Sequence, residues 1–206
     1  MCFLKLMRIQ TISPKCNFSK PKKLSFQASI PVEKLTHTNI GMAKNGLIGN
    51  VEVLKANGEK VFLNVFKYAN CLKEIFFLKD NAEQVIGEIE LKVKKAINYD
   101  KVAYPQDPSH VYVEILRNYS DPKTPFYRNG LEEYKHIGAR LLQIAHRRSD
   151  EAQCNGNIEL TSRTESFDFY YALGFKNSDL TWGGNPYRLY LPPEAKEPFS
   201  KRYGGL

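Results

Sequence analysis

Apolar and polar residues alternate along much of the stretch between residues 51 and 93, a pattern typical of strands in a half-buried sheet. Residues 51–54 and 61–66 are both rich in Val, Leu and Phe, and the dipeptide Asn57-Gly58 lies between them. An Asn-Gly pair between two such runs favours a two-residue type I′ turn. We therefore predict a first β-hairpin in this part of the chain.

A second hairpin is predicted from residues 74–78 and 85–93, which are joined by the polar segment 79–83. In the second of these runs, Glu88 and Glu90 alternate with apolar residues. This alternation predicts a sheet with one face toward solvent. Three later runs also have the composition of strands: 110–117, 157–161 and 187–191.

Two helices are predicted in the second half of the chain. From Tyr134 to about Arg148, apolar residues recur at helical spacing and would form one stripe. Ser162 and Glu165 have the spacing of a capping box, which would begin a second helix. Gly174 is the expected glycine just beyond the end of that helix.

Hairpins followed by strand, helix, strand, helix and strand predict an α+β fold with a mixed, mostly antiparallel sheet flanked by helices. We place one domain at residues 33–192. The segment 1–32 carries basic residues and no acid, and we interpret it as a loose N-terminal arm. Residues 193–206 are predicted to form a polar tail.

A loop of about sixteen residues, 118–133, separates the strand at 110–117 from the first predicted helix. It is polar and contains two prolines and an Asn-Gly pair. Long loops in compact domains are often functional, so we expect this one to border the site where a substrate binds.

The chain of 206 residues has 30 Lys and Arg against 22 Asp and Glu, a net charge of +8. The excess favours anions, either a phosphorylated cofactor or a nucleic acid. No run of eighteen apolar residues predicts a membrane helix. The cysteines are scattered without CxxC or zinc-finger spacing, so we expect reduced thiols, no metal site and a cytoplasmic protein. The basic, acid-free segment 1–32 leaves an organellar transit peptide as the alternative.

The start of the first predicted helix has the features of an anion site. Gly138 and Ala139 would let a ligand approach the backbone, whose first N–H groups have no partner within the helix. Lys135 and Arg140 would add positive charge. The chain has neither the Gly-Lys-Ser/Thr of a P-loop nor the Gly-x-Gly-x-x-Gly of a dinucleotide-binding fold. An ordinary structural glycine at a helix start remains the alternative.

Residues 133–142 resemble the acyl-CoA-binding motif of the GNAT acyltransferases, Gln/Arg-x-x-Gly-x-Gly/Ala followed by Leu-Leu. Further along, Phe169-Tyr170-Tyr171-Ala172-Leu173-Gly174-Phe175 is similar to the Phe-Tyr-x-x-Leu-Gly-Phe signature of the same superfamily. The resemblance covers about residues 51–191. Two positions depart from the first motif, since Glu133 stands where Gln or Arg is usual and His136 replaces the first glycine.

This resemblance implies a GNAT-like fold in which one central strand pair splays apart and acetyl-CoA enters the gap. The backbone of Ile115, Leu116 and Arg117 would bind the pantetheine. The diphosphate would be held by a set of groups at the helix start: the side chain of His136 and the backbone amides of Ile137, Gly138, Ala139 and Arg140.

The resemblance also implies acetyl transfer to a primary amine by direct attack in a ternary complex. Tyr170 matches the tyrosine that protonates the departing thiolate, with a role as a core aromatic as the alternative. Glu114 is our candidate base, because we expect it to share a face with Leu116, and its alternative is a charged residue on the solvent side. Glu88 and Glu90 are secondary candidates.

Two further hypotheses stay open. A GNAT-fold binding module with little turnover is suggested by Glu133 and His136. A basic nucleic-acid-binding protein is suggested by the charge, although no recognised nucleic-acid motif supports it.

Overall fold

The computed structural model describes residues 40–95, 109–177, 185–192 and 195. Within them, nine strands form one sheet in the order β6-β1-β2-β3-β4-β5-β7-β9-β8. Nearly all pairs are antiparallel, and β5 and β7 are parallel. The predicted α+β class with a mixed, mostly antiparallel sheet is confirmed. The predicted arm at 1–32 and most of the tail at 193–206 lie outside the described residues.

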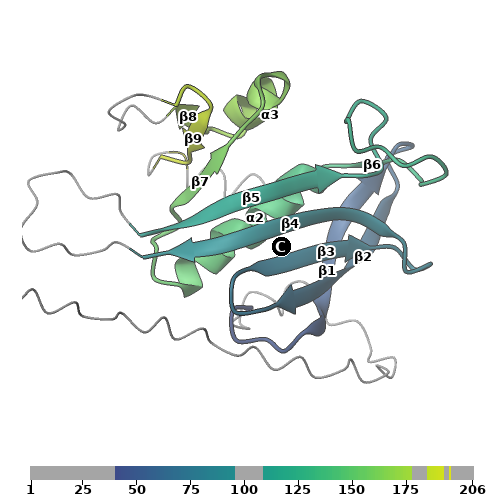
Figure 1. Ribbon diagram of the computed structural model, residues 1–206. Coiled ribbons are helices and arrows are strands. Elements are labelled where there is room, and N and C mark those ends of the chain that lie inside the picture. Colours follow the sequence, from purple (N-terminus) through teal and green to yellow (C-terminus); the bar gives the residue numbers. More distant parts are fainter. Residues whose placement is uncertain (1–39, 96–108, 178–184, 193–194, 196–206) are drawn as a thin grey trace, which may run out of the picture.

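The first four strands follow one another in the sheet as two consecutive hairpins with a third turn between them (Figure 1). Both predicted hairpins are confirmed. The bounds are β1 Gly46–Lys55, β2 Lys60–Ala69, β3 Glu74–Lys79 and β4 Val85–Lys94.

The predicted type I′ turn of the first hairpin is wrong. The Gly58 N–H donates to the Lys55 carbonyl at 2.9 Å, so the turn spans residues 55–58. Gly58 has a φ of 89°, whereas Asn57 does not have a positive φ. A type I′ turn requires positive φ at both central residues, so the glycine here closes a longer connection instead.

The second half of the sheet is built on β5, which pairs with β4 on one side and with β7 on the other. The remaining strands are short, and β6 and β8 lie at the two edges. The bounds are β5 His110–Asn118, β6 Tyr134–Lys135, β7 Ile158–Thr161, β8 Lys176–Asn177 and β9 Arg188–Tyr190.

The long helix α2 spans Ile137–Glu151, so its predicted start at Tyr134 is wrong. Tyr134 and Lys135 instead pair with β1 as the edge strand β6. His136 stands between strand and helix with φ 68° and ψ 11°, a left-handed conformation that is uncommon for a residue other than glycine.

The second predicted helix is shorter than its pattern suggested. A 3₁₀ turn η1 spans Thr164–Ser166 and leads into α3, Phe167–Ala172. The predicted capping box is wrong, because the Ser162 hydroxyl donates to the neighbouring Arg163 carbonyl rather than capping the helix.

The predicted glycine at the end of α3 is confirmed. Gly174 has a φ of 92° and its N–H donates to the Tyr171 carbonyl, while the Phe175 N–H donates to the Tyr170 carbonyl. These two bonds form a Schellman motif, in which an apolar contact between Tyr170 and Phe175 is expected and found.

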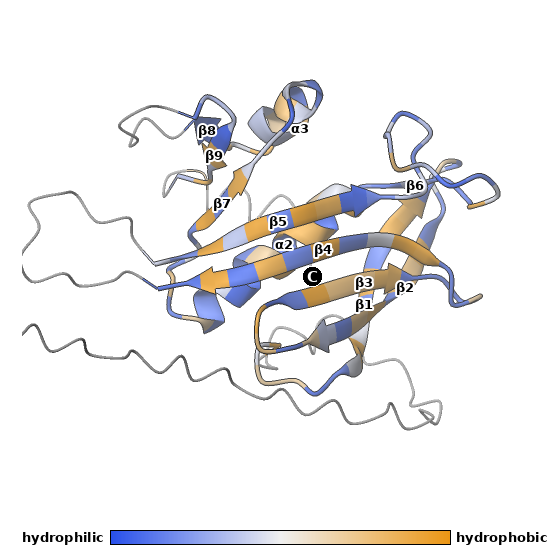
Figure 2. Ribbon diagram, viewed as in Figure 1, coloured by the Kyte–Doolittle hydropathy of each residue, from blue (hydrophilic) through white to orange (hydrophobic). Residues whose placement is uncertain are grey.

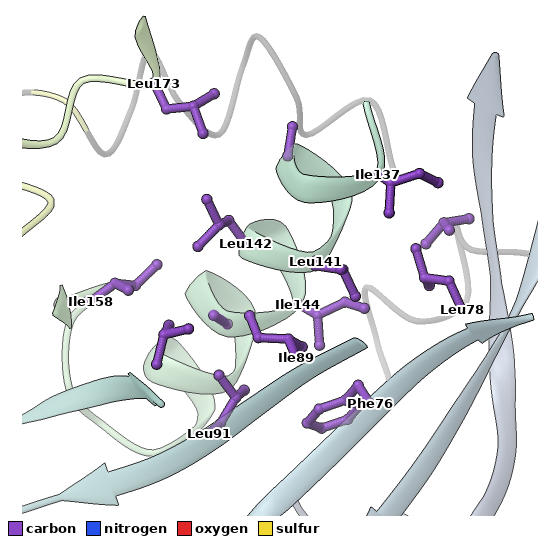
Figure 3. Packing of buried hydrophobic residues seen from close by; sticks show 14 of the residues in the cluster. Phe76, Leu78, Ile89, Leu91, Ile137, Leu141, Leu142, Ile144, Ile158 and Leu173 are labelled. Carbon is purple, nitrogen blue, oxygen red and sulfur yellow. The ribbon is translucent and has the colours of Figure 1, made fainter. Parts of the chain in front are cut away.

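The core lies between α2 and one face of the sheet (Figure 3). Ile137, Leu141 and Leu142 of α2 are buried against strand residues such as Ile89 and Leu91. Gly87 of β4 permits this approach, since a Cβ there would lie 2.6 Å from Cγ2 of Ile137. Figure 2 shows the apolar and polar positions alternating along β4.

The expectation that the polar face of β4 points to solvent is wrong for two residues. Glu88 and Glu90 are only 9% and 8% exposed. Each carboxylate is paired with a cation that is itself partly exposed, Arg117 for Glu88 and Lys73 for Glu90. Ion pairing lets these carboxylates sit under neighbouring side chains, which the alternation of residue types does not reveal.

The cysteines only partly follow the expectation of reduced thiols. Cys154 is a buried free thiol, whose pKa is raised by burial. Cys71 is disulfide-bonded. Neither of the described helices is long and apolar enough to cross a membrane.

Candidate functional site

Strands β5 and β7 separate toward their carboxyl ends. Their pairing ends at Val113 and Leu160, whereas β5 continues to Asn118 and β7 turns away toward α3 (Figure 1). The predicted splayed central pair is therefore confirmed. Ligands of sheets that contain parallel strands commonly bind beyond the carboxyl ends of those strands, so this gap is the candidate site.

The amino end of α2 lies beside this gap. A Cβ on Gly87 would meet Ile137 of α2 at 2.6 Å and the Arg117 carbonyl of β5 at 3.1 Å, which places the two elements against each other. The first N–H groups of a helix have no partner inside it, and they carry the positive end of its dipole. Ile137, Gly138 and Ala139 supply such groups here. The amide of Arg140 does not, since it donates to the His136 carbonyl at 3.0 Å.

The two cations expected at this helix end point elsewhere. The Lys135 ammonium donates to the Ala56 carbonyl at 3.0 Å, in the turn between β1 and β2. The Arg140 guanidinium donates to the Glu52 carbonyl of β1 at 2.8 Å, and burial lowers the pKa of Arg140. Positive charge at this helix end therefore comes from the backbone.

Gly138 lies under the ring of Phe169 from α3. A Cβ on Gly138 would be 2.7 Å from Cζ of that ring, closer than real side chains approach. Phe169 is itself 37% exposed. The glycine is thus explained by packing, and the ring covers the helix end at which the motif resemblance places a diphosphate.

Tyr170 is buried beside the same helix end, and Tyr171 is not. The Tyr170 ring packs edge-on against Phe169 and Phe175, and burial raises the pKa of Tyr170 to about 12. Its hydroxyl makes no hydrogen bond within the described part of the chain. Tyr171 is 44% exposed and its hydroxyl donates to Asn177 Oδ1 at 2.6 Å.

A bulge in β5 changes the position of Glu114. Glu90 pairs with Ile115 and Leu91 pairs with Val113, so Glu114 is the extra residue between them. The expectation that Glu114 shares a face with Leu116 is wrong. Leu116 pairs with Ile89 and packs against the core, whereas Glu114 accepts a bond at 2.6 Å from Lys92 on the opposite face.

Beyond the bulge, successive residues of β5 point their backbone N–H and C=O groups alternately toward β4 and toward the gap. The Tyr119 N–H donates to the Ile86 carbonyl of β4. Alternation in an antiparallel ladder then turns the backbone groups of Ile115 and Arg117 toward β4 and those of Leu116 toward the gap. Of the three residues expected to bind pantetheine, Leu116 is the one whose backbone is available.

Arg117, Glu88 and Tyr119 form a compact cluster on the face opposite α2. Arg117 Nη1 donates to Glu88 Oε1 at 2.6 Å. Tyr119 is 5% exposed and is coupled electrostatically to both side chains, and its pKa is raised, first by burial. The pKa of Arg117 is raised by Tyr119 and, to a smaller extent, by Glu88.

The loop between β5 and β6 closes over this cluster. Its residue Phe126 lies between two guanidinium groups, 5.2 Å from Arg117 and 5.9 Å from Arg163. Arg163 follows the end of β7, so the ring bridges the two diverging strands. The loop is tied down by Arg128, which stacks on Tyr119 at 3.7 Å, and by the bond from the Tyr134 N–H to Ser120 Oγ.

The predicted site residues therefore divide between two sides of one gap. Gly138, Tyr170 and the first amides of α2 lie on the helix side, and Glu114 and Arg117 lie on the opposite face. Sequence reasoning missed Tyr119, Phe126, Arg163 and the contact of Phe169 with Gly138. None of these residues has a periodic pattern, and the length of the loop was the only signal of its role. Within the described ranges, no three His, Cys, Asp or Glu side chains are grouped as a metal site.

No protein-family model matches the chain, and no curated protein sequence does so either. Among solved structures, the chain is similar to AtaTR bound with AcCoA, at 18% identity and a TM-score of 0.41 over 61% of this chain and 73% of that one. It is also similar to Chaetomium thermophilum Naa20 in complex with a bisubstrate analogue, at 16% identity and a TM-score of 0.39 over 60% and 68%. A third similar structure is a nourseothricin acetyltransferase, at 14% identity and a TM-score of 0.35 over 79% and 92%. At these values the likeness is partial and says nothing of activity.

Proposed function

We propose that this chain is a GNAT-type N-acetyltransferase, which moves an acetyl group from acetyl-CoA to a primary amine by direct attack in a ternary complex. The observation that carries the proposal is the opening of the β5–β7 pair beside the amino end of α2. The two sequence motifs of the GNAT resemblance fall on that helix end and on α3. The amine is a protein N-terminus, a lysine or a small molecule.

The residues present fit acetyl-CoA through backbone groups more than through side chains. The amides of Ile137, Gly138 and Ala139 would donate to the diphosphate, and the Leu116 backbone would bond the pantetheine. The ring of Phe169 would have to move off Gly138 to admit the diphosphate, and its partial exposure allows this. When bound, acetyl-CoA supplies the activated acetyl group.

The reaction needs two proton transfers, one from the attacking amine and one to the departing thiolate, and side chains of this protein would carry out both. Glu114 would take the proton from the attacking amine. It directly follows the last residue of β5 that is paired with β7, and it therefore lies where the gap begins. Its partner Lys92 is 39% exposed in its side chain, so the ion pair can open to solvent. Glu88 is less suited, since its carboxylate is buried and is bonded to Arg117.

Tyr170 would give a proton to the departing thiolate. Its raised pKa keeps the phenol protonated throughout the physiological range. Its hydroxyl has no competing partner within the described residues. Packing by Phe169 and Phe175 fixes the ring and so limits the positions that the hydroxyl can reach.

The experiment for this proposal is calorimetric titration with acetyl-CoA, followed by detection of free thiol across a library of amines. We expect saturable binding and thiol release with at least one class of amine. Absence of binding at millimolar acetyl-CoA would contradict the proposal.

A second candidate function is a GNAT-fold module that binds acyl-CoA or a partner with little turnover. It is favoured by the Phe169 ring on Gly138 and by Lys135 and Arg140, whose side chains are engaged at β1. Such a protein would bind acetyl-CoA and release no thiol with any amine in the same library.

A further inference from the structure

Three carboxylates on the sheet face opposite α2 are each paired with one cation. Glu88 is bonded to Arg117 at 2.6 Å, Glu114 to Lys92 at 2.6 Å, and Glu90 to Lys73. Each pair cancels its own charge. Any cation left over on this side of the gap therefore sets the sign of the local electrostatic potential.

Arg163 is such a cation. Its side chain is exposed, and within the residues that the structure describes its guanidinium contacts the Phe126 ring and has no carboxylate partner. Glu165 and Asp168 follow it in sequence, are exposed, and form no ion pair with it. The Phe126 ring lies 5.9 Å from this guanidinium, within cation–π distance, and a contact of this kind leaves the N–H edges of the cation available.

Arg163 lies just beyond the end of β7, where β7 has separated from β5. It follows β7 directly, and Phe126 joins it to Arg117 of β5. An acceptor amine that approaches Glu114 from this face would bring its other groups toward Phe126 and Arg163. A carboxylate in that position would accept two parallel bonds from one guanidinium.

We propose that the acceptor carries a carboxylate near its amine, and that Arg163, held by Phe126, binds this carboxylate. This inference rests on the proposed acetyl transfer and names the substrate class for the same site. The anion could instead be a phosphate group of acetyl-CoA, so the experiment separates the two sources.

The test compares acceptors that differ only in charge: the dipeptide amides Ala-Glu-NH₂ and Ala-Gln-NH₂, and 4-aminobutyrate with its amide. We expect kcat/KM to be about tenfold or more higher for the acidic member of each pair, as for charged hydrogen bonds. The Arg163→Gln variant should remove this preference and leave the KM for acetyl-CoA unchanged. Arg128→Gln removes one positive charge from the same loop and is the control, because Arg128 stacks on Tyr119 instead.

Three outcomes would overturn the inference: no preference in the parent protein, an equal preference in Arg163→Gln, or a higher KM for acetyl-CoA in that variant. The last outcome would assign Arg163 to the cofactor phosphates. Binding of both dipeptides is also titrated without acetyl-CoA, which tests the carboxylate site independently of the proposed acetyl transfer. Tighter binding of Ala-Glu-NH₂ that depends on Arg163, without thiol release, would support the carboxylate site and contradict acetyl transfer.

Discussion

Phe169 and Gly138 are in direct contact, such that a Cβ on Gly138 would lie 2.7 Å from Cζ of the Phe169 ring. The contact joins α3 to the first turn of α2, the two elements that carry the sequence motifs. It gives the glycine a structural role even before any ligand is considered.

The first prediction tests this contact with Gly138→Ala. The added methyl should overpack against the ring and lower the free energy of unfolding by about 1–3 kcal/mol, despite the higher helix propensity of alanine. Phe169→Ala should relieve the clash, so the double variant should lose less than the sum of the two single losses. Urea unfolding of the four proteins measures this coupling, and additive losses would show that the ring does not constrain Gly138.

A second prediction concerns His136, whose φ of 68° is unfavourable for a residue with a side chain. Replacement by glycine should raise the free energy of unfolding by about 0.5–1 kcal/mol, because glycine adopts this conformation without steric cost. His136→Val should lower it by at least as much, since β-branched residues tolerate positive φ poorly. Equal stability of the two variants would contradict the assignment of strain to this position.

The third prediction concerns the acid role of Tyr170. Tyr170→Phe should lower turnover about ten- to ten-thousand-fold while the dissociation constant for acetyl-CoA barely changes. Tyr171→Phe is the matched control, because it removes one hydroxyl from the same helix and loses only an exposed bond to Asn177. Parent-like turnover in Tyr170→Phe would exclude the acid role.

The fourth prediction follows from the raised pKa of Tyr170, about 12 in the folded protein. An unfolded tyrosine titrates near pH 10, so between about pH 10 and pH 12 the unfolded chain loses a proton that the folded chain keeps. Stability should therefore fall as pH rises through this range, by up to roughly 3 kcal/mol from this residue. Guanidinium unfolding of the parent and of Tyr170→Phe at matched pH values isolates the effect, and parallel curves would contradict it.

The fifth prediction concerns Glu114 as the base. Glu114→Gln should lower kcat/KM for the amine about 10²–10⁴-fold and flatten the acidic limb of its pH profile. Glu90→Gln removes a charge from the adjacent strand at a residue bonded to Lys73, so comparison of the two variants separates Glu114 from this secondary candidate. A parent-like pH profile in Glu114→Gln would show that water or another group takes the proton.

The sequence by itself determined the hairpins, the core stripe of α2 and the end of α3 at Gly174. These depend on local periodicity and on backbone preferences that a few neighbouring residues set. The two GNAT-like motifs could also be recognised from the sequence, because each falls within one short segment. Even so, the helix start was misplaced, since the pairing of Tyr134 and Lys135 with β1 involves residues about eighty positions away.

Tertiary structure alone decided how the site is arranged. A single bulge residue put Glu114 and Leu116 on different faces of β5, and alternation cannot show where an extra residue is inserted. Ion pairing with Arg117 and Lys73 buried Glu88 and Glu90, although their residue type predicts exposure. Phe126 and Arg163 meet only because β5 and β7 diverge and the loop folds back between them. Such contacts join distant segments, and their geometry exists only once the sheet has formed.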